Sequence, residues 1–158
     1  MSKYENAMKL MEKFCGNGDK DNTIALATVS LSNVAGNPRP SVRMVNSYYE
    51  NGVLYVSTDA RKNKTLEIEK NNEVSICGLD LFVANGKAEN IGWVKDEKNA
   101  EIRAKMAKVF AWWYDHNDEN DPNSIVLRIT LTNGTITDNE KIYGEWKYEV
   151  DFVNKTVK

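Results

Sequence analysis

The most informative segment of the chain is SVRMVNSYYENGVLYVS, residues 41–57. It contains two runs rich in β-branched and aromatic residues, 41–49 and 53–57, which predict two strands. Between these runs stands Glu50-Asn51-Gly52, and Asn-Gly is a strong hairpin signal because both residues tolerate positive φ. The segment therefore predicts an antiparallel strand pair.

More strands and several helices are predicted on both sides of this hairpin. A turn is expected over 33–40, where Gly36, Pro38 and Pro40 disfavour ladder pairing. The further strands are expected at 23–31, 73–77, 81–88, 124–131, 135–137 and 143–153. Apolar spacing predicts helices over 4–15, from Thr58-Asp59-Ala60 to about Asn71, and over 96–114, followed by a polar loop, 115–123.

This order of elements indicates one antiparallel barrel. Short strands joined mostly by tight turns exclude the alternating pattern of a doubly wound parallel sheet. Closing the sheet on itself removes its exposed edges. We therefore expect an α+β fold, mainly β, with flanking helices and with the helix 4–15 packed on the barrel. A length of 158 residues fits a single domain, 1–158.

Composition narrows the function classes. The chain is 41% hydrophobic and carries a formal net charge of -2, without the cationic surplus of a dedicated nucleic-acid binder. It has neither an apolar run of the ~20 residues that span a membrane nor a visible secretory signal. Its two cysteines, Cys15 and Cys77, cannot form a disulfide framework. A cytoplasmic protein without nucleic-acid or membrane partners is expected.

The sequence offers no catalytic residue and no metal site. His116 is the one histidine, so the clustered His and Cys ligands of a zinc site are absent from the sequence. A catalytic triad would have only this histidine as its base, and no serine lies in a nucleophile-elbow motif. The acidic loop after Asp115 begins like a calcium loop but has Asn120 and Val126 where glycine and glutamate are diagnostic. No glycine-rich phosphate loop is present.

Cations and hydroxyls do gather around the hairpin. Arg43 lies within a predicted strand, where an unpaired buried charge is expensive and an anionic partner is expected. Hydroxyls, cations and free amides at a helix start suit a phosphate monoester. Alternatively, Thr58 or Asp59 simply caps the helix and the lysines are solvated. The residues that support the phosphate reading are Arg43, Ser57, Thr58, Arg61, Lys62 and Lys64.

Three runs carry a resemblance to a known family: GNPRPSVRMV (36–45), LYVSTDARKNKTLEIEKNNEVSICG (54–78) and FVANGKAE (82–89). They resemble the FMN-binding split barrel of the pyridoxamine 5'-phosphate oxidase-like superfamily, nearest its general-stress-protein and nitroimidazole-resistance branches. The resemblance covers roughly residues 20–140. It implies a six-stranded antiparallel barrel of Greek-key topology, a homodimer, and FMN bound at the subunit interface.

The resemblance also assigns roles to individual residues. Arg43-Met44-Val45 matches a strand segment whose arginine faces the FMN phosphate or ribityl chain and whose backbone groups reach the flavin ring. Ser57 and Thr58 match a hydroxyl pair that donates to the phosphate.

The matching cation depends on the alignment. Counting back from Asn71-Asn72 places Lys64 on the phosphate-binding lysine, whereas a slip would bring Arg61 and Lys62 there instead. Gly86 matches a glycine of a later strand.

Departures from the family pattern separate this chain from the vitamin B6 oxidases. Tyr48 stands where those enzymes have a lysine, and their substrate-binding terminal segment has no counterpart. Thr137-Asp138 replaces a Trp-Asp pair near the flavin, so that contact is either missing or supplied by Trp112, Trp113 or Trp146. Three functions remain open. The first is an FMN-dependent oxidoreductase that passes electrons from NAD(P)H or reduced flavin to a small acceptor, and the second is a non-catalytic flavin- or ligand-binding stress protein. The third is a split barrel without a cofactor that acts through protein contacts.

Overall fold

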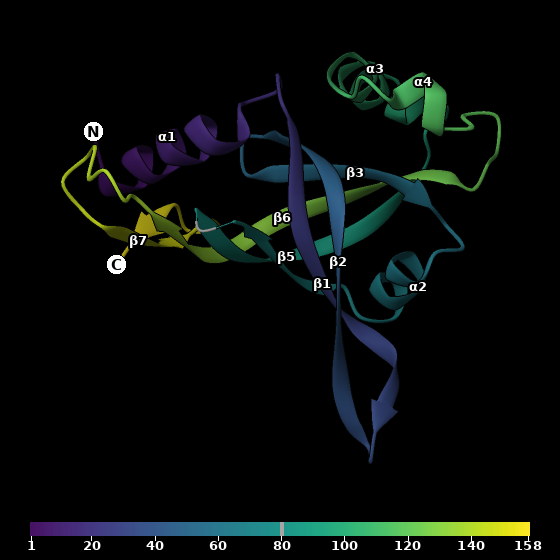
Figure 1. Cartoon of the computed structure of the whole chain (residues 1–158), viewed down its shortest axis with the longest axis horizontal. Helices are drawn as coiled ribbons and strands as arrows, with labels where there is room; N and C mark the ends of the chain where they lie inside the picture. Colours follow the sequence, from purple (N-terminus) through teal and green to yellow (C-terminus); the bar gives the residue numbers. More distant parts are fainter. Residues whose placement is uncertain (80) are drawn as a thin grey trace.

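The structure is a computed structural model that describes residues 1–79 and 81–158 (Figure 1). Strands dominate it, and the helices lie around them. In chain order the elements are α1 (Lys3–Cys15), β1 (Asp21–Val34), β2 (Asn37–Glu50), β3 (Val53–Asp59), α2 (Asn63–Lys70), β4 (Glu73–Gly78), β5 (Phe82–Trp93), the 3-10 turn η1 (Glu97–Asn99), α3 (Ala100–Val109), α4 (Trp113–His116), β6 (Ser124–Thr137), β7 (Lys147–Asp151) and β8 (Thr156–Val157).

Strands β1 to β6 form a closed antiparallel barrel, as predicted. Neighbouring strands follow the order β3-β2-β1-β4-β5-β6, and β3 pairs with β6 to close the ring. Strand β4 returns after α2 to lie beside β1, which gives the spatial order 4-1-2-3 of a Greek key. Strands β7 and β8 extend the sheet beyond β6.

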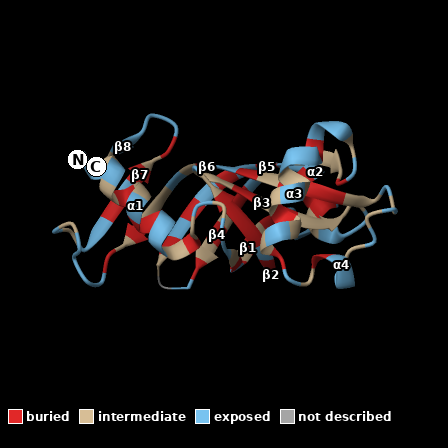
Figure 2. Cartoon of the chain, turned by 90° about the horizontal axis from the view of Figure 1, so that it is seen from above, coloured by how far each residue is buried: buried red, intermediate tan, exposed pale blue. Residues whose placement is uncertain are grey.

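The buried residues, coloured red in Figure 2, include two hydrophobic clusters that hold the molecule together. The larger group fills the barrel and includes Leu10 and Met11 of α1, a helix that lies close to β7 (Figure 1). The smaller group packs Met106, Phe110 and Trp113 against the outer side of the barrel at Tyr48 and Val126. The second group fixes α3 and α4 over one end of β2, β3 and β6.

The hairpin prediction at Asn51-Gly52 is confirmed, since both residues have positive φ. The turn expected over 33–40 is present but shorter, and the expected loss of ladder pairing at Pro38 and Pro40 is wrong. The ends of this segment pair as β1 and β2, and only Ala35 and Gly36 turn, both with positive φ. Pro38 and Pro40 are tolerated because this part of β2 is an edge strand: it pairs with β1 on one side, and its pairing with β3 begins only at Tyr48. On the unpaired side no neighbouring strand needs the N–H group that proline lacks.

Helix 96–114 is also wrong as one element. It divides into η1, α3 and α4, with Phe110 in an extended conformation between the helices. This break lets Phe110 and Trp113 both reach the smaller core, where each is at most 1% exposed, and Phe110 stacks on Trp112 at 4.9 Å. Burial of the Phe110 and Trp113 rings outweighs helix continuity.

The C-terminal strands have different bounds from those expected. The segments predicted at 124–131 and 135–137 form the single strand β6, because its first part pairs with β3 and its last part with β7. The strand predicted over 143–153 is shorter and is followed by β8. Within this segment Tyr148 and Val150 are buried, whereas Trp146, which precedes β7, is exposed.

Candidate phosphate site

The predicted site residues lie where β3 ends and α2 begins. The helix expected from Thr58 starts later, at Asn63, because Ser57, Thr58 and Asp59 continue the ladder with Val126, Ile125 and Ser124 of β6. Of the three cations, only Lys64 lies within α2, and Lys62 occupies its N-cap position. The hydroxyls are therefore held by a strand rather than by a helix terminus.

Lys64 and Thr58 form the centre of the site. The Lys64 ammonium group donates a hydrogen bond to the Thr58 hydroxyl at 3.1 Å. Burial lowers the pKa of Lys64, and the nearby cations Arg43 and Lys62 lower it further. Among the described residues no carboxylate forms an ion pair with Lys64. A half-buried cation with a hydroxyl beside it and no counter-ion is suited to an anionic ligand.

Arg43 has its anionic partner inside the protein. Its guanidinium lies 3.4 Å from the carboxylate of Glu67 in α2, and the two side chains are 22% and 5% exposed. It also donates to the hydroxyls of Thr28, at 2.7 Å, and Ser41, at 2.9 Å. An anionic partner for Arg43 was expected, but the sequence did not point to Glu67, whose side chain is buried although its neighbour Leu66 is exposed.

Arg61 ties two loops together. Its guanidinium bonds to the carboxylates of Asp59, at 2.6 Å, and Asp121, at 2.9 Å, on the surface of the molecule. Hydrogen bonds from Arg61 lower the pKa of Asp59 to about 2, and Asp59 raises that of Arg61. Lys62 is exposed and forms no ion pair among the described residues. Arg61 is thus neutralised by the protein, and Lys62 and Lys64 are not.

A cleft of about 450 Å³ adjoins this site. The Ser57 hydroxyl faces it and donates to the side-chain oxygen of Asn117 at 3.1 Å. The side-chain nitrogen of Asn117 is buried and has no acceptor among the described residues. Sequence reasoning missed Asn117 because it lies 60 positions from Ser57 in a loop without periodicity. The residues that line the cleft are Ser57, Thr58, Asp59, Arg61, Lys62, Trp112, His116, Asn117, Asp118, Asp121 and Ser124.

The three tryptophans named as alternative ring contacts lie in different places. Trp112 lines the cleft. Trp113 is fully buried in the smaller core, and exposed Trp146 packs against the Lys141 ammonium group at 4.4 Å. Of the three, only Trp112 is positioned to contact a molecule in this cleft.

Strand alternation separates Met44 from Arg43, whereas Val45 lies on the same face of β2 as Arg43. Val45 points into the barrel and is buried, whereas Met44 lies on the outer face and is exposed. The pairing register places Met44 opposite Ala25, Ala25 opposite Cys77, and Cys77 opposite Val83. We call these four residues the outer row; it crosses β2, β1, β4 and β5 and carries no charge.

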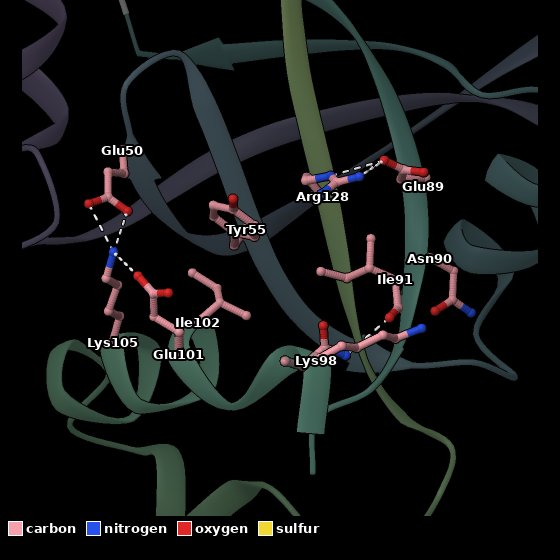
Figure 3. A pocket seen from close by; sticks show the side chains of 11 residues that line it. Glu50, Tyr55, Glu89, Asn90, Ile91, Lys98, Glu101, Ile102, Lys105 and Arg128 are labelled. Carbon is pink, nitrogen blue, oxygen red and sulfur yellow. Dashed lines mark hydrogen bonds and ion pairs between the residues drawn. The ribbon is translucent and has the colours of Figure 1, made fainter. Parts of the chain in front are cut away.

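A second cleft, of about 570 Å³, lies between α3 and the outer face of β3, β5 and β6 (Figure 3). Its charged side chains bind one another: Lys105 contacts Glu50 at 3.0 Å, and Arg128 pairs with Glu89. Tyr55 and Ile102 lie between these pairs (Figure 3). None of the predicted site residues lines this cleft.

The described residues contain no cluster of three or more potential metal ligands. None of the described helices is long and apolar enough to cross a membrane.

A closed antiparallel barrel with cations and hydroxyls at the end of β3 is the arrangement of a split-barrel protein. Several solved structures share this fold. General Stress Protein 26 from Bacillus anthracis matches with a TM-score of 0.55 and 18% identity, over 80% of this chain and 89% of its own. A pyridoxamine 5'-phosphate oxidase-related, FMN binding protein from Nostoc punctiforme matches with a TM-score of 0.58 and 17% identity, over 94% and 89%. A NimC/NimA family protein from Clostridium acetobutylicum matches with a TM-score of 0.53 and 19% identity, over 95% and 88%.

Residues 14–138 match the family described as Pyridoxamine 5'-phosphate oxidase. The chain therefore belongs to this family, as its sequence motifs indicated. No curated protein matches the chain in sequence at a significant level.

Proposed function

We propose that the protein is an FMN-binding flavoprotein and that Lys64 and Thr58 anchor the FMN phosphate. The observation that carries this proposal is the half-buried Lys64 ammonium group, bonded to a hydroxyl and without a carboxylate partner among the described residues. Support also comes from family membership and from the FMN binding named for the Nostoc punctiforme relative.

The neighbouring cleft fits a flavin in its chemistry. The side-chain nitrogen of Asn117 is a buried donor without an acceptor among the described residues, and an oxygen or ring nitrogen of a ligand could accept its hydrogen bond. Trp112 provides an aromatic surface, and Ser57 orients Asn117. Arg43 and Lys62 add positive charge around the phosphate, whereas Arg61 holds the loop rather than the ligand. Met44 and Val45 would contribute backbone groups only.

We propose oxidoreduction as the activity. Bound FMN would supply the electron or hydride transfer, and the protein would supply binding, orientation and exclusion of water. This division requires no strong acid or base from the chain. The proposed donor is NAD(P)H or reduced flavin, and the proposed acceptor is a small molecule such as a quinone or nitro compound.

A homodimer is the proposed assembly, and the cytoplasm, where its two free cysteines would stay reduced, is the proposed location. Support for the homodimer comes from the outer row. Met44 and Val83 are 59% and 55% exposed, and the smaller Ala25 and Cys77 lie between them. A second copy would remove this apolar surface from water.

Titration with FMN tests the proposed anchor. Lys64→Ala should weaken FMN binding at least tenfold, since a hydrogen bond to a charged group is worth ~1.5–3 kcal/mol. Lys70→Ala, which removes an exposed cation from the same helix, serves as the matched control and should leave the affinity within about twofold. Protein that is colourless when purified and does not quench FMN fluorescence would refute the proposal.

The alternative is a flavin carrier or stress-related binding protein without turnover. The replacement of the Trp-Asp pair by Thr137-Asp138 favours it, because Asp138 is buried and its backbone bonds to Trp146. Stopped-flow mixing of the FMN-loaded protein with NADH or NADPH separates the two. Bleaching of the flavin absorbance on a timescale of seconds supports the oxidoreductase, and an unchanged spectrum supports the carrier.

A further inference from the structure

A buried carboxylate stands beside the proposed phosphate anchor. Glu67 of α2 contacts both neighbouring strands: the Thr28 hydroxyl of β1 donates to it at 2.6 Å, and Arg43 of β2 contacts both of its oxygens at 3.4 and 3.5 Å. Glu67 is 4% exposed and Thr28 is 3% exposed. An anion in this position changes what Arg43 can offer to a ligand.

The four N–H groups on the terminal nitrogens of Arg43 are already in use. One terminal nitrogen donates to the Leu26 carbonyl, at 3.2 Å, and to the Thr28 hydroxyl. The other donates to the Ser41 hydroxyl and to Glu67. Of the five donors of a guanidinium, only the Nε–H forms no hydrogen bond among the described residues. A ligand phosphate can therefore gain a terminal N–H of Arg43, and the two-pronged contact that it would allow, only by displacing an existing partner.

We propose that Glu67 is a specificity-determining residue that competes with the ligand phosphate for Arg43. This inference rests on the proposed FMN site. A phosphate dianion held by Lys64 and Thr58 meets a second negative charge in a poorly solvated region, where repulsion between like charges is strong. If the phosphate instead displaces Glu67, the carboxylate loses its contacts with Arg43 and Thr28. In both cases the phosphate adds less to affinity than it would beside a free Arg43.

The consequence concerns the choice between ligands. FMN and riboflavin differ only in the phosphate, so their affinity ratio isolates the contribution of this anchor. Glu67 lowers the preference for FMN over riboflavin, so the flavin ring and the ribityl chain supply a larger share of the binding free energy. The site would then tolerate flavins that lack a terminal phosphate better than a site with an unopposed arginine.

The test compares Glu67→Gln with Glu69→Gln. Both remove one negative charge from α2, but Glu69 is exposed and does not contact Arg43. Fluorescence titrations with FMN and riboflavin are expected to show FMN affinity rising at least about fivefold in Glu67→Gln, with riboflavin within about twofold, because one charge-assisted contact is released. Glu69→Gln should change neither. Equal behaviour of the two variants would overturn the inference.

Inorganic phosphate provides a readout that does not depend on flavin. In thermal unfolding with increasing phosphate at constant ionic strength, Glu67→Gln should gain more protection than the wild type or Glu69→Gln. If the wild type binds no flavin, the proposed function fails, and the phosphate series still decides the role of Glu67. Identical phosphate protection in all three proteins would overturn it.

A second variant covers the case in which Glu67→Gln does not fold. Glu67→Asp keeps the charge but shortens the side chain by one methylene, which draws the carboxylate away from Arg43. An intermediate gain in phosphate protection is expected. No gain in this variant, when it alone folds, would count against the proposal.

Discussion

At the scale of single residues, the surroundings of Lys64 disfavour its positive charge in the folded protein, and a bound anion would relieve this cost. Burial and the cations around it lower its pKa from the ordinary value of 10.5. The folded state therefore binds this proton less tightly than the unfolded chain does. The charge opposes folding below the lowered pKa, and this penalty disappears as the pH rises towards 10.5.

We predict that Lys64→Met increases the free energy of unfolding at pH 7 while it weakens FMN binding. The increase should shrink at pH values approaching the ordinary pKa of lysine, because the wild-type side chain then loses its charge in both states. Urea denaturation at several pH values measures this. Lys70→Met is the control, and a Lys64→Met protein less stable than this control would contradict the prediction.

Among the elements, α3 and α4 are joined to the loop before β6 by Glu119. Its carboxylate accepts two hydrogen bonds from Arg103, at 2.7 and 2.8 Å, and one from the Trp113 indole at 2.7 Å. Hydrogen bonding to Arg103 lowers the pKa of Glu119, and the indole contributes in the same direction. This side chain holds Trp113 in the smaller core.

We predict that this region loosens in acid. The contribution of Glu119 is complete above its unfolded pKa and is lost as the pH falls through the lower, folded value. Tryptophan fluorescence should shift to longer wavelength earlier in an acid titration than the loss of β-sheet circular dichroism. Glu119→Gln should remove this early step, and coincident transitions in the wild type would disprove the idea.

Strands β5 and β6 meet closely at Gly86. A Cβ atom there would lie 2.7 Å from the Thr130 carbonyl oxygen and 3.2 Å from Ile129, at a shift in the pairing register. Backbone is the nearer obstacle, so the contact cannot be relieved by a side-chain rotation.

We predict that Gly86→Ala destabilises the protein by about 1–3 kcal/mol, the range for overpacking. Asn85→Ala, which alters an exposed neighbour on the same strand, should cost less, about 0.5–1.5 kcal/mol for the hydrogen bond that it removes. Thermal unfolding of both variants measures the difference. Equal stabilities would mean that the strands separate easily at this point.

At the scale of the whole molecule, the outer row is the surface through which we propose that two copies of the chain associate. Cys77 lies in this row, partly exposed, with its sulfur 3.2 Å from the Leu79 carbonyl. Its accessibility would therefore report whether a second copy covers the face.

We predict that Met44→Asp converts the proposed dimer into a monomer and exposes Cys77 to disulfide reagents. A buried carboxylate without a partner strongly opposes association. Light scattering gives the mass, and the rate of thiol labelling gives the exposure. Val153→Asp, which places the same charge in the exposed turn after β7, should change neither. A wild-type monomer at micromolar concentration would exclude the proposed assembly.

The sequence alone determined the local features of this protein. Asn51-Gly52 predicted the hairpin because two neighbouring residues suffice to define a tight turn, and the motifs around Arg43 and Lys64 predicted the family and its barrel. Strand alternation could also have shown that Met44 and Val45 face opposite sides of β2. These features depend on neighbours along the chain, which a pattern of residues records directly.

Only the tertiary structure decided which distant groups meet. It placed Glu67 on Arg43, brought Asn117 to Ser57, and paired Arg61 with Asp121. It also broke the helix at Phe110, because the demand for buried aromatic surface comes from Tyr48 and Val126 of the barrel. Charge pairing and burial depend on distances between elements, and those distances exist only once β3 has closed on β6.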